Sequence, residues 1–162
     1  MGDWNRSTSK KTLDQIQPAH WRAIQEHLES YNLKLDLEDY LMCIETISHK
    51  KKWKLFGYGM PKQTIQFVIL TPKWLFLSVE GDKPDSVGVL SIQLKDAVAE
   101  DYKDSPSYKL VQDNAINLTG IYTGRVGMHG NARISSMLVL GEEPAAAEFK
   151  EILFKSIADA KQ

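Results

Sequence analysis

The sequence contains one cysteine, Cys43, so no disulfide can form within the chain. The apolar neighbours of Cys43 favour a buried, unreactive thiol, and the scarcity of cysteine fits a reducing compartment.

Long apolar runs are also missing. No run approaches the about 20 residues of a membrane-spanning helix, and residues 1–11 lack the apolar core of a signal peptide. We therefore expect a soluble cytoplasmic protein.

An excess of charge of one sign is absent as well. The 162 residues include 20 Lys and Arg and 21 Asp and Glu, which leaves a formal net charge of −1. Such a chain has no overall field that attracts nucleic acid or a membrane, so any attraction must come from a local patch. We expect no nucleic-acid partner.

Catalytic and metal-binding signatures are missing too. His20 and His27 lie almost two turns apart on one expected helix, which is too far for both to bind one metal, so both are expected to be surface or packing residues. No serine stands in a nucleophile-elbow context, and Glu142 and Glu143 precede a helix whose dipole explains them. We expect no enzymatic activity, no bound metal and no cofactor.

The chain does contain a succession of strand patterns between two helix patterns. Residues 1–12 are polar and rich in Ser, Thr and Lys, so we expect a flexible tail. Pro18 suits the first turn of a helix, and residues 13–39 are expected to form this helix and a connector. The apolar residues of the helix recur at spacings of three and four: Trp21, Ile24, Leu28 and Tyr31.

From Leu41 the apolar pattern changes to a period of two, which is typical of strands. Both faces of the stretch 73–79 are largely apolar, so one face is expected to lie under a helix. At Pro144 a helix pattern begins, with Phe149 and Leu153 on its apolar side. The predicted strands cover 41–49, 63–70, 73–79, 87–94, 97–102, 108–112, 115–122 and 133–140.

Strands in this number expose unpaired backbone edges unless the sheet closes, or nearly closes, on itself. We therefore predict a mainly β fold with α+β character. It is a barrel-like sandwich of about seven antiparallel strands, capped by a C-terminal α-helix and preceded by an extra N-terminal helix. Residues 40–162 are expected to form this one domain.

Three stretches resemble pleckstrin-homology-like (PH-like) domains, and most of all the bacterial ones. Residues 68–77, VILTPKWLFL, resemble the turn between the second and third strands of these domains. Residues 91–100, SIQLKDAVAE, resemble the approach to the fourth strand, and residues 138–150, LVLGEEPAAAEFK, resemble the last strand and the closing helix. The resemblance covers about residues 40–160 and implies a PH-like barrel that serves as a small binding or assembly domain.

The strongest candidate binding segment runs from His49 to Lys62. Lysines offer mobile charges for phosphates, and interleaved aromatic residues suit a lipid headgroup boundary. The alternative is a solvated strand end whose aromatic residues fold back on the barrel. Phosphoinositide-binding relatives carry a second basic group early in the next strand, where this chain has no arginine, so a stereospecific headgroup site is not expected. The candidate residues are Lys50, Lys51, Lys52, Trp53, Lys54 and Lys62.

The glycine-rich stretch 119–130, which holds Arg125 and His129, is a second candidate. Glycine lets a backbone approach a ligand closely, and the Arg125 guanidinium could form paired hydrogen bonds with a carboxylate or phosphate. No helix follows directly, so the stretch is not a nucleotide-phosphate loop. The alternative is a plain hairpin connection.

Two functions from different classes are therefore open. The first is a non-catalytic interaction module of PH-like fold, which associates with itself as a homo-oligomer or docks a protein partner through strand edges and the N-terminal helix. The alternative is a peripheral protein that binds anionic membrane phospholipid through segment 49–62.

Overall fold

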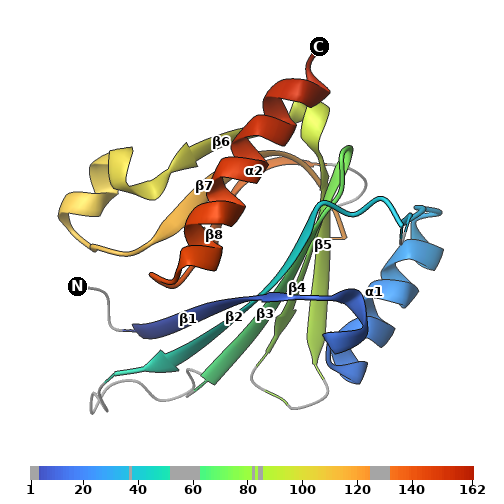
Figure 1. Ribbon diagram of the computed structural model, residues 1–162, viewed down its shortest axis with the longest axis horizontal. Helices are drawn as coiled ribbons and strands as arrows, with labels where there is room; N and C mark the ends of the chain where they lie inside the picture. Colours follow the sequence, from blue (N-terminus) through green and yellow to red (C-terminus); the bar gives the residue numbers. More distant parts are fainter. Residues whose placement is uncertain (1–3, 37, 52–62, 82, 84–85, 125–131) are drawn as a thin grey trace.

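The computed structural model of the chain describes residues 4–36, 38–51, 63–81, 83, 86–124 and 132–162. Eight antiparallel strands in these residues form one curled half-barrel sheet, and two α-helices pack on it (Figure 1). The predicted mainly β fold with a C-terminal helix and an extra N-terminal helix is confirmed. The elements are β1 Trp4–Lys11, α1 Pro18–Ser30, β2 Met42–Lys50, β3 Gln63–Leu70, β4 Trp74–Glu80, β5 Val87–Gln93, β6 Val98–Asp101, β7 Ala115–Thr123, β8 Ala132–Val139 and α2 Pro144–Ala160.

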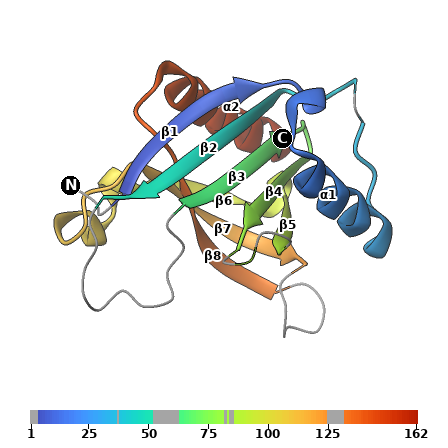
Figure 2. The ribbon, with the colours of Figure 1, turned by 90° about the horizontal axis from the view of Figure 1, so that it is seen from below.

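Strands β1 to β5 lie in sequence order, and β7 joins them to the rest of the sheet (Figure 2). One side of β7 pairs with β5 at Tyr122 and Thr123 and with β6 over 116–119. The other side of β7 pairs with β8 along its length, from Ala115 to Tyr122. The sheet therefore bends at β5 and β7, and its two halves face each other.

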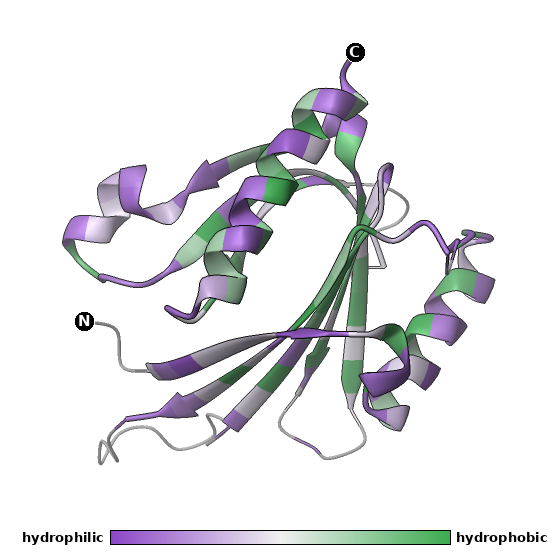
Figure 3. Ribbon diagram, in the orientation of Figure 1, coloured by the Kyte–Doolittle hydropathy of each residue, from purple (hydrophilic) through white to green (hydrophobic). Residues whose placement is uncertain are grey.

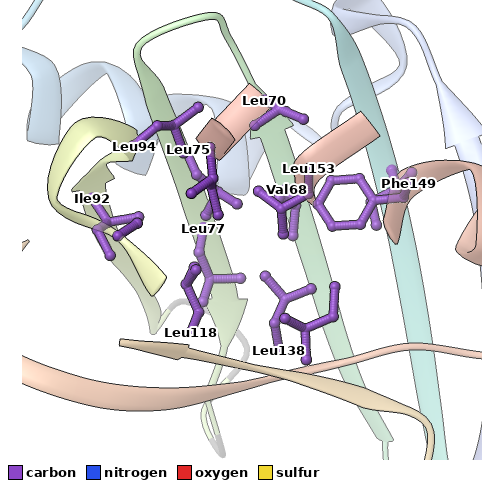
Figure 4. Close-up of a cluster of buried hydrophobic side chains, with 14 of the residues drawn as sticks. Val68, Leu70, Leu75, Leu77, Ile92, Leu94, Leu118, Leu138, Phe149 and Leu153 are labelled. Carbon is purple, nitrogen blue, oxygen red and sulfur yellow. The ribbon is translucent and has the colours of Figure 1, made fainter. Parts of the chain in front are cut away.

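Helix α2 closes the opening between these halves (Figure 1). Pro144 occupies the first turn, where its missing N–H costs no hydrogen bond, and Phe149 and Leu153 on the buried side are fully enclosed. Inward side chains of the strands, such as Leu77 and Leu138, surround them in one inner core (Figure 4). Apolar side chains thus fill the space inside the half-barrel.

Helix α1 covers the outer face of β4 and β5. Ile24 of this helix packs with Phe67 and Phe76, which point away from the inner core because successive strand residues alternate between faces. The expectation that one apolar face of the 73–79 stretch lies under a helix is confirmed. Figure 3 shows hydrophobic and hydrophilic residues on different sides of both helices. Neither helix in the described residues is long and apolar enough to cross a bilayer.

The prediction of a flexible tail over residues 1–12 is wrong for Trp4–Lys11, which form the edge strand β1. This strand pairs with β2 over its whole length, and Thr8 at its centre is buried. Hydrogen bonds to the β2 backbone and around Thr8 hold a strand that carries few apolar side chains. Such a strand leaves little trace in hydrophobicity, and its polar composition suggested disorder.

The predicted strand over 108–112 is also wrong. This stretch lies in a connector with two short 3₁₀ turns, η3 (Tyr102–Asp104) and η4 (Pro106–Lys109). Pro106 begins the second turn, and Leu110 and Val111 are exposed instead of buried in a sheet. Two adjacent large apolar residues resemble part of a strand pattern in the sequence, although both face solvent in the structure.

Candidate functional site: a cleft at the rim of the half-barrel

Two of the eight candidate residues lie in the described part of the chain. Lys50 ends β2 opposite Trp4 of β1, and Lys51 follows it as an exposed residue. The other six fall outside the described residues: Lys52, Trp53, Lys54, Lys62, Arg125 and His129.

Lys51 lines a cleft of about 360 Å³ at the end of the half-barrel where β1 begins and β2 ends. We call it the rim cleft. Its walls come from four places in the chain: the start of β1, the end of β2, the connector between β6 and β7, and the turn between β8 and α2. The lining residues are Trp4, Asn5, Arg6, Lys51, Lys103, Tyr108, Gln112, Asp113, Asn114, Leu140, Gly141 and Glu142.

A largely buried ion pair forms one wall of the rim cleft. The Arg6 guanidinium contacts the Asp113 carboxylate, and its Nε donates to Ser48 Oγ at 3.2 Å. The same guanidinium lies 5.9 Å from the centre of the Trp4 ring, within the range of a cation–π contact. These contacts join β1 to the connector before β7, so Arg6 and Asp113 hold the cleft in shape.

A second polar cluster supports the cleft from behind. Lys150 of α2 donates to Asp101 Oδ2 at 2.9 Å and to Asn114 Oδ1 at 2.6 Å. Partial burial raises the pKa of Asp101, but hydrogen bonds from Lys150 and from the Lys103 backbone outweigh it, so this pKa lies below its ordinary value. Asp101 is therefore ionised near neutral pH and anchors α2 to the connector.

The exposed edge of the cleft is weakly basic. Three basic residues and two acidic residues line it, and the Arg6–Asp113 pair cancels one charge of each sign. Lys51 and Lys103 then stand against Glu142, and the rings of Trp4 and Tyr108 provide apolar walls. This arrangement suits the recognition of an acidic group with a donor or apolar surface beside it.

The two histidines of α1 are buried packing residues, one of the two outcomes that the sequence left open. His20 Nδ1 lies 2.9 Å from Ser78 Oγ, and His27 Nε2 lies 2.8 Å from Ser91 Oγ. Burial lowers the pKa of His20 to about 4 and also lowers that of His27, so both imidazoles are neutral. Because α1 covers both serines completely, no substrate reaches these hydroxyls.

Sequence reasoning did not predict the histidine–serine pairs, although one signal pointed to them. His20 and His27 share the helix face of Ile24, which is fully buried.

The predicted burial of the Cys43 thiol is confirmed, and burial raises the pKa of this thiol to about 12, with the Glu45 charge adding to the effect. A thiol in that state is a poor nucleophile. Among the described residues, no three His, Cys, Asp or Glu side chains gather in a way that could hold a metal.

Other hollows in the described residues offer less. One of about 500 Å³ lies between Trp74 and the end of α2. Asp159 and the negative end of the helix dipole there offset the positive charges of Lys73 and Lys95. Another, of about 720 Å³, is a wide, mostly apolar depression beside Trp21 and Tyr40. Of these three hollows in the described residues, the rim cleft is the one that contains a candidate residue expected from the sequence.

Comparison of the chain with protein-family models, with curated proteins and with solved structures gave no match in any of the three.

Proposed function

We propose that this protein is a non-catalytic interaction module of PH-like fold that docks a protein partner through the rim cleft. The order of elements supports the resemblance, since strands β2 to β8 are followed by a closing helix. We propose in addition that the protein is cytoplasmic and that it has no enzymatic activity.

The observation that carries the proposal is the make-up of the rim cleft. Lys51 and Lys103 stand at its open edge, beside two aromatic rings and on walls tied by the Arg6–Asp113 pair. Apolar side chains fill the interior of the half-barrel, so a partner meets the protein at its rim and edges. A rigid cleft with a few polar groups and aromatic walls is a common form of recognition site.

The partner that this cleft fits best is an acidic segment of another protein. Two lysines attract carboxylates, while the carboxylate of Glu142 limits the net charge of the lining to about one positive unit. A small cleft of low net positive charge favours a short acidic segment over an extended anionic surface. Self-association remains part of the proposal through surfaces other than this cleft.

A second function, binding to an anionic membrane, is favoured by one observation. Lys50 ends β2 opposite Trp4, and Lys51 follows it. These two are the first lysines of the lysine-rich segment 49–62. Each lysine near an anionic bilayer contributes about 1 kcal/mol, and tryptophan suits the headgroup region. In that case the protein is peripheral to the cytoplasmic face of a membrane.

One experiment separates these functions. The wild type is mixed with a labelled oligo-glutamate peptide and, separately, with phosphatidylserine-containing and neutral vesicles. Docking of an acidic protein segment predicts salt-sensitive peptide binding, and anionic-membrane binding predicts co-sedimentation with the anionic vesicles alone. Docking is contradicted if the protein does not bind the peptide at low salt, and membrane binding is contradicted if the anionic vesicles do not carry it down.

A double variant, Lys51→Glu with Lys103→Glu, ties any peptide binding to the cleft. We expect its affinity for the peptide to fall at least about tenfold, because attraction of about 1 kcal/mol from each exposed lysine becomes repulsion. Lys34→Glu with Lys161→Glu is the matched control, since it makes the same change of charge at two exposed lysines that do not line the cleft. Equal losses in the variant and the control would point to non-specific attraction.

A further inference from the structure

The sheet ends in strands that have a neighbour on one side only, and these edges differ. Within the described residues, β1 pairs with β2 alone, and β6 and β8 each pair with β7 alone. An unprotected edge is a template for another strand, so natural proteins cover, shorten or charge their edges.

Two of the three edges are protected in these ways. Strand β1 carries Arg6, Lys10 and Lys11, and the Glu143 carboxylate accepts the N–H of Thr8 at 2.8 Å. Strand β6 has four residues. Strand β8 has eight residues, ARISSMLV, without proline and with Arg133 as its one charged side chain.

Every second residue of β8 bonds to β7, and this alternation shows which backbone groups face the open edge of the strand. The N–H of Leu140 donates to the carbonyl of Asn114 at 2.9 Å, so residues of β8 at even numbers bond to β7. Arg133, Ser135 and Met137 therefore direct their N–H and C=O groups away from β7. The side-chain amide of Gln66 donates to the Val139 carbonyl at 3.2 Å, as this alternation requires.

We propose that two copies of this chain pair antiparallel along β8, about a two-fold axis that passes between their Ser135 residues. This interface goes beyond the proposed partner site and requires nothing of the rim cleft. Ser135 then lies opposite its own counterpart, and Arg133 lies opposite Met137 of the other copy. Each of these pairs exchanges two hydrogen bonds, about six in all.

The strand favours this register and this occupant. An axis at Arg133 would place like charges opposite each other, and an axis at Met137 would need the Val139 carbonyl, which Gln66 already occupies. In the register at Ser135, the apolar part of Arg133 covers Met137, which is 39% exposed in the single chain. Strand β8 is therefore complementary to itself.

Pairing along one strand buries less surface than a standard interface, so we expect a dimer that dissociates in the micromolar range. Sedimentation velocity over a concentration series into the high micromolar range measures it. Ser135→Pro removes an outward N–H and leaves the bonds of β8 to β7 intact, so this variant should stay monomeric. Ser135→Ala keeps the N–H and should dimerise like the wild type.

A charge pair at the axis provides a test that does not depend on proline. Ser135→Lys and Ser135→Glu each place like charges opposite themselves, so each alone should be monomeric, and an equal mixture should regain the dimer mass.

The proposal is overturned if the wild type is monomeric at the highest concentration. It is also overturned if the proline and charge variants dimerise unchanged, which places the contact elsewhere. The Lys51→Glu and Lys103→Glu double variant should still dimerise, so loss of its dimer would assign self-association to the rim cleft instead.

Discussion

At the scale of single residues, the buried polar groups are the least ordinary feature of this protein. His20 is 1% exposed, and its Nε2 has no hydrogen-bond partner within the described residues, while Nδ1 meets Ser78. A neutral imidazole tolerates this site, but a charged one would be buried without a counter-charge. The attachment of α1 to the sheet therefore depends on neutral histidines.

We predict that stability falls as the pH drops from about 6.5 towards 4. The pKa of His20 is 6.5 in the unfolded chain and about 4 in the folded one, so in this window the unfolded state binds a proton that the folded state does not. For His20 alone the loss is about 3 kcal/mol. Lowered pKa values keep Asp101 and Glu143 ionised in the folded protein until the pH is more acidic, so the upper part of the window reports on the histidines.

Urea denaturation at pH 7 and pH 5 measures this effect. His20→Gln keeps a polar group near Ser78 and cannot take up the proton, so its stability should change less than that of the wild type between the two pH values. An equal change in both proteins would show that His20 does not titrate on unfolding.

At the scale of elements, β1 and α2 complete a half-barrel that the other strands leave open. Thr8 is the point where they meet. Its Oγ1 lies 2.8 Å from Thr46 Oγ1 and accepts the N–H of Gly141 at 2.7 Å. The strand that composition assigned to a flexible tail is thus bonded to β2 on one side and to the start of α2 on the other.

Thr8→Val should therefore destabilise the protein by about 1–3 kcal/mol, because the buried Gly141 N–H and Thr46 hydroxyl lose their partner. Asn5→Ala, at an exposed position of the same strand, is the control and should change stability by less than about 0.5 kcal/mol. Thermal melts of both variants measure the difference. Equal melting temperatures for Thr8→Val and the wild type would mean that the two hydrogen bonds of the Thr8 hydroxyl contribute nothing to stability.

Phe149 and Phe154 test the docking of α2 on the inner core. Phe149 is fully buried, while Phe154 on the same helix is 36% exposed. Phe149→Ala should cost about 3–5 kcal/mol by opening a cavity, and Phe154→Ala should cost much less. Comparable losses in chemical denaturation would contradict the orientation of the helix.

At the scale of the whole molecule, the sequence predicted what depends on local pattern. Alternation located β3 at 63–70, the residues that the structure assigns to it, and the helical period located α2 from Pro144. The rim cleft could not be predicted, because its walls come from residues near 5, 51, 108 and 141, which only the closed sheet brings together. Lys51 was a candidate through its charge alone, and Lys103 and Trp4 carried no signal of their own.

We hold that partners bind this protein at the rim cleft, and nuclear magnetic resonance of the isotope-labelled protein during titration with an oligo-glutamate peptide tests this at single residues. We predict that amide signals of residues 4–6, 51, 103, 108 and 140–142 shift together and saturate, while those of α1 stay in place. An absence of shifts at low salt, or shifts confined to other surfaces, would contradict the claim.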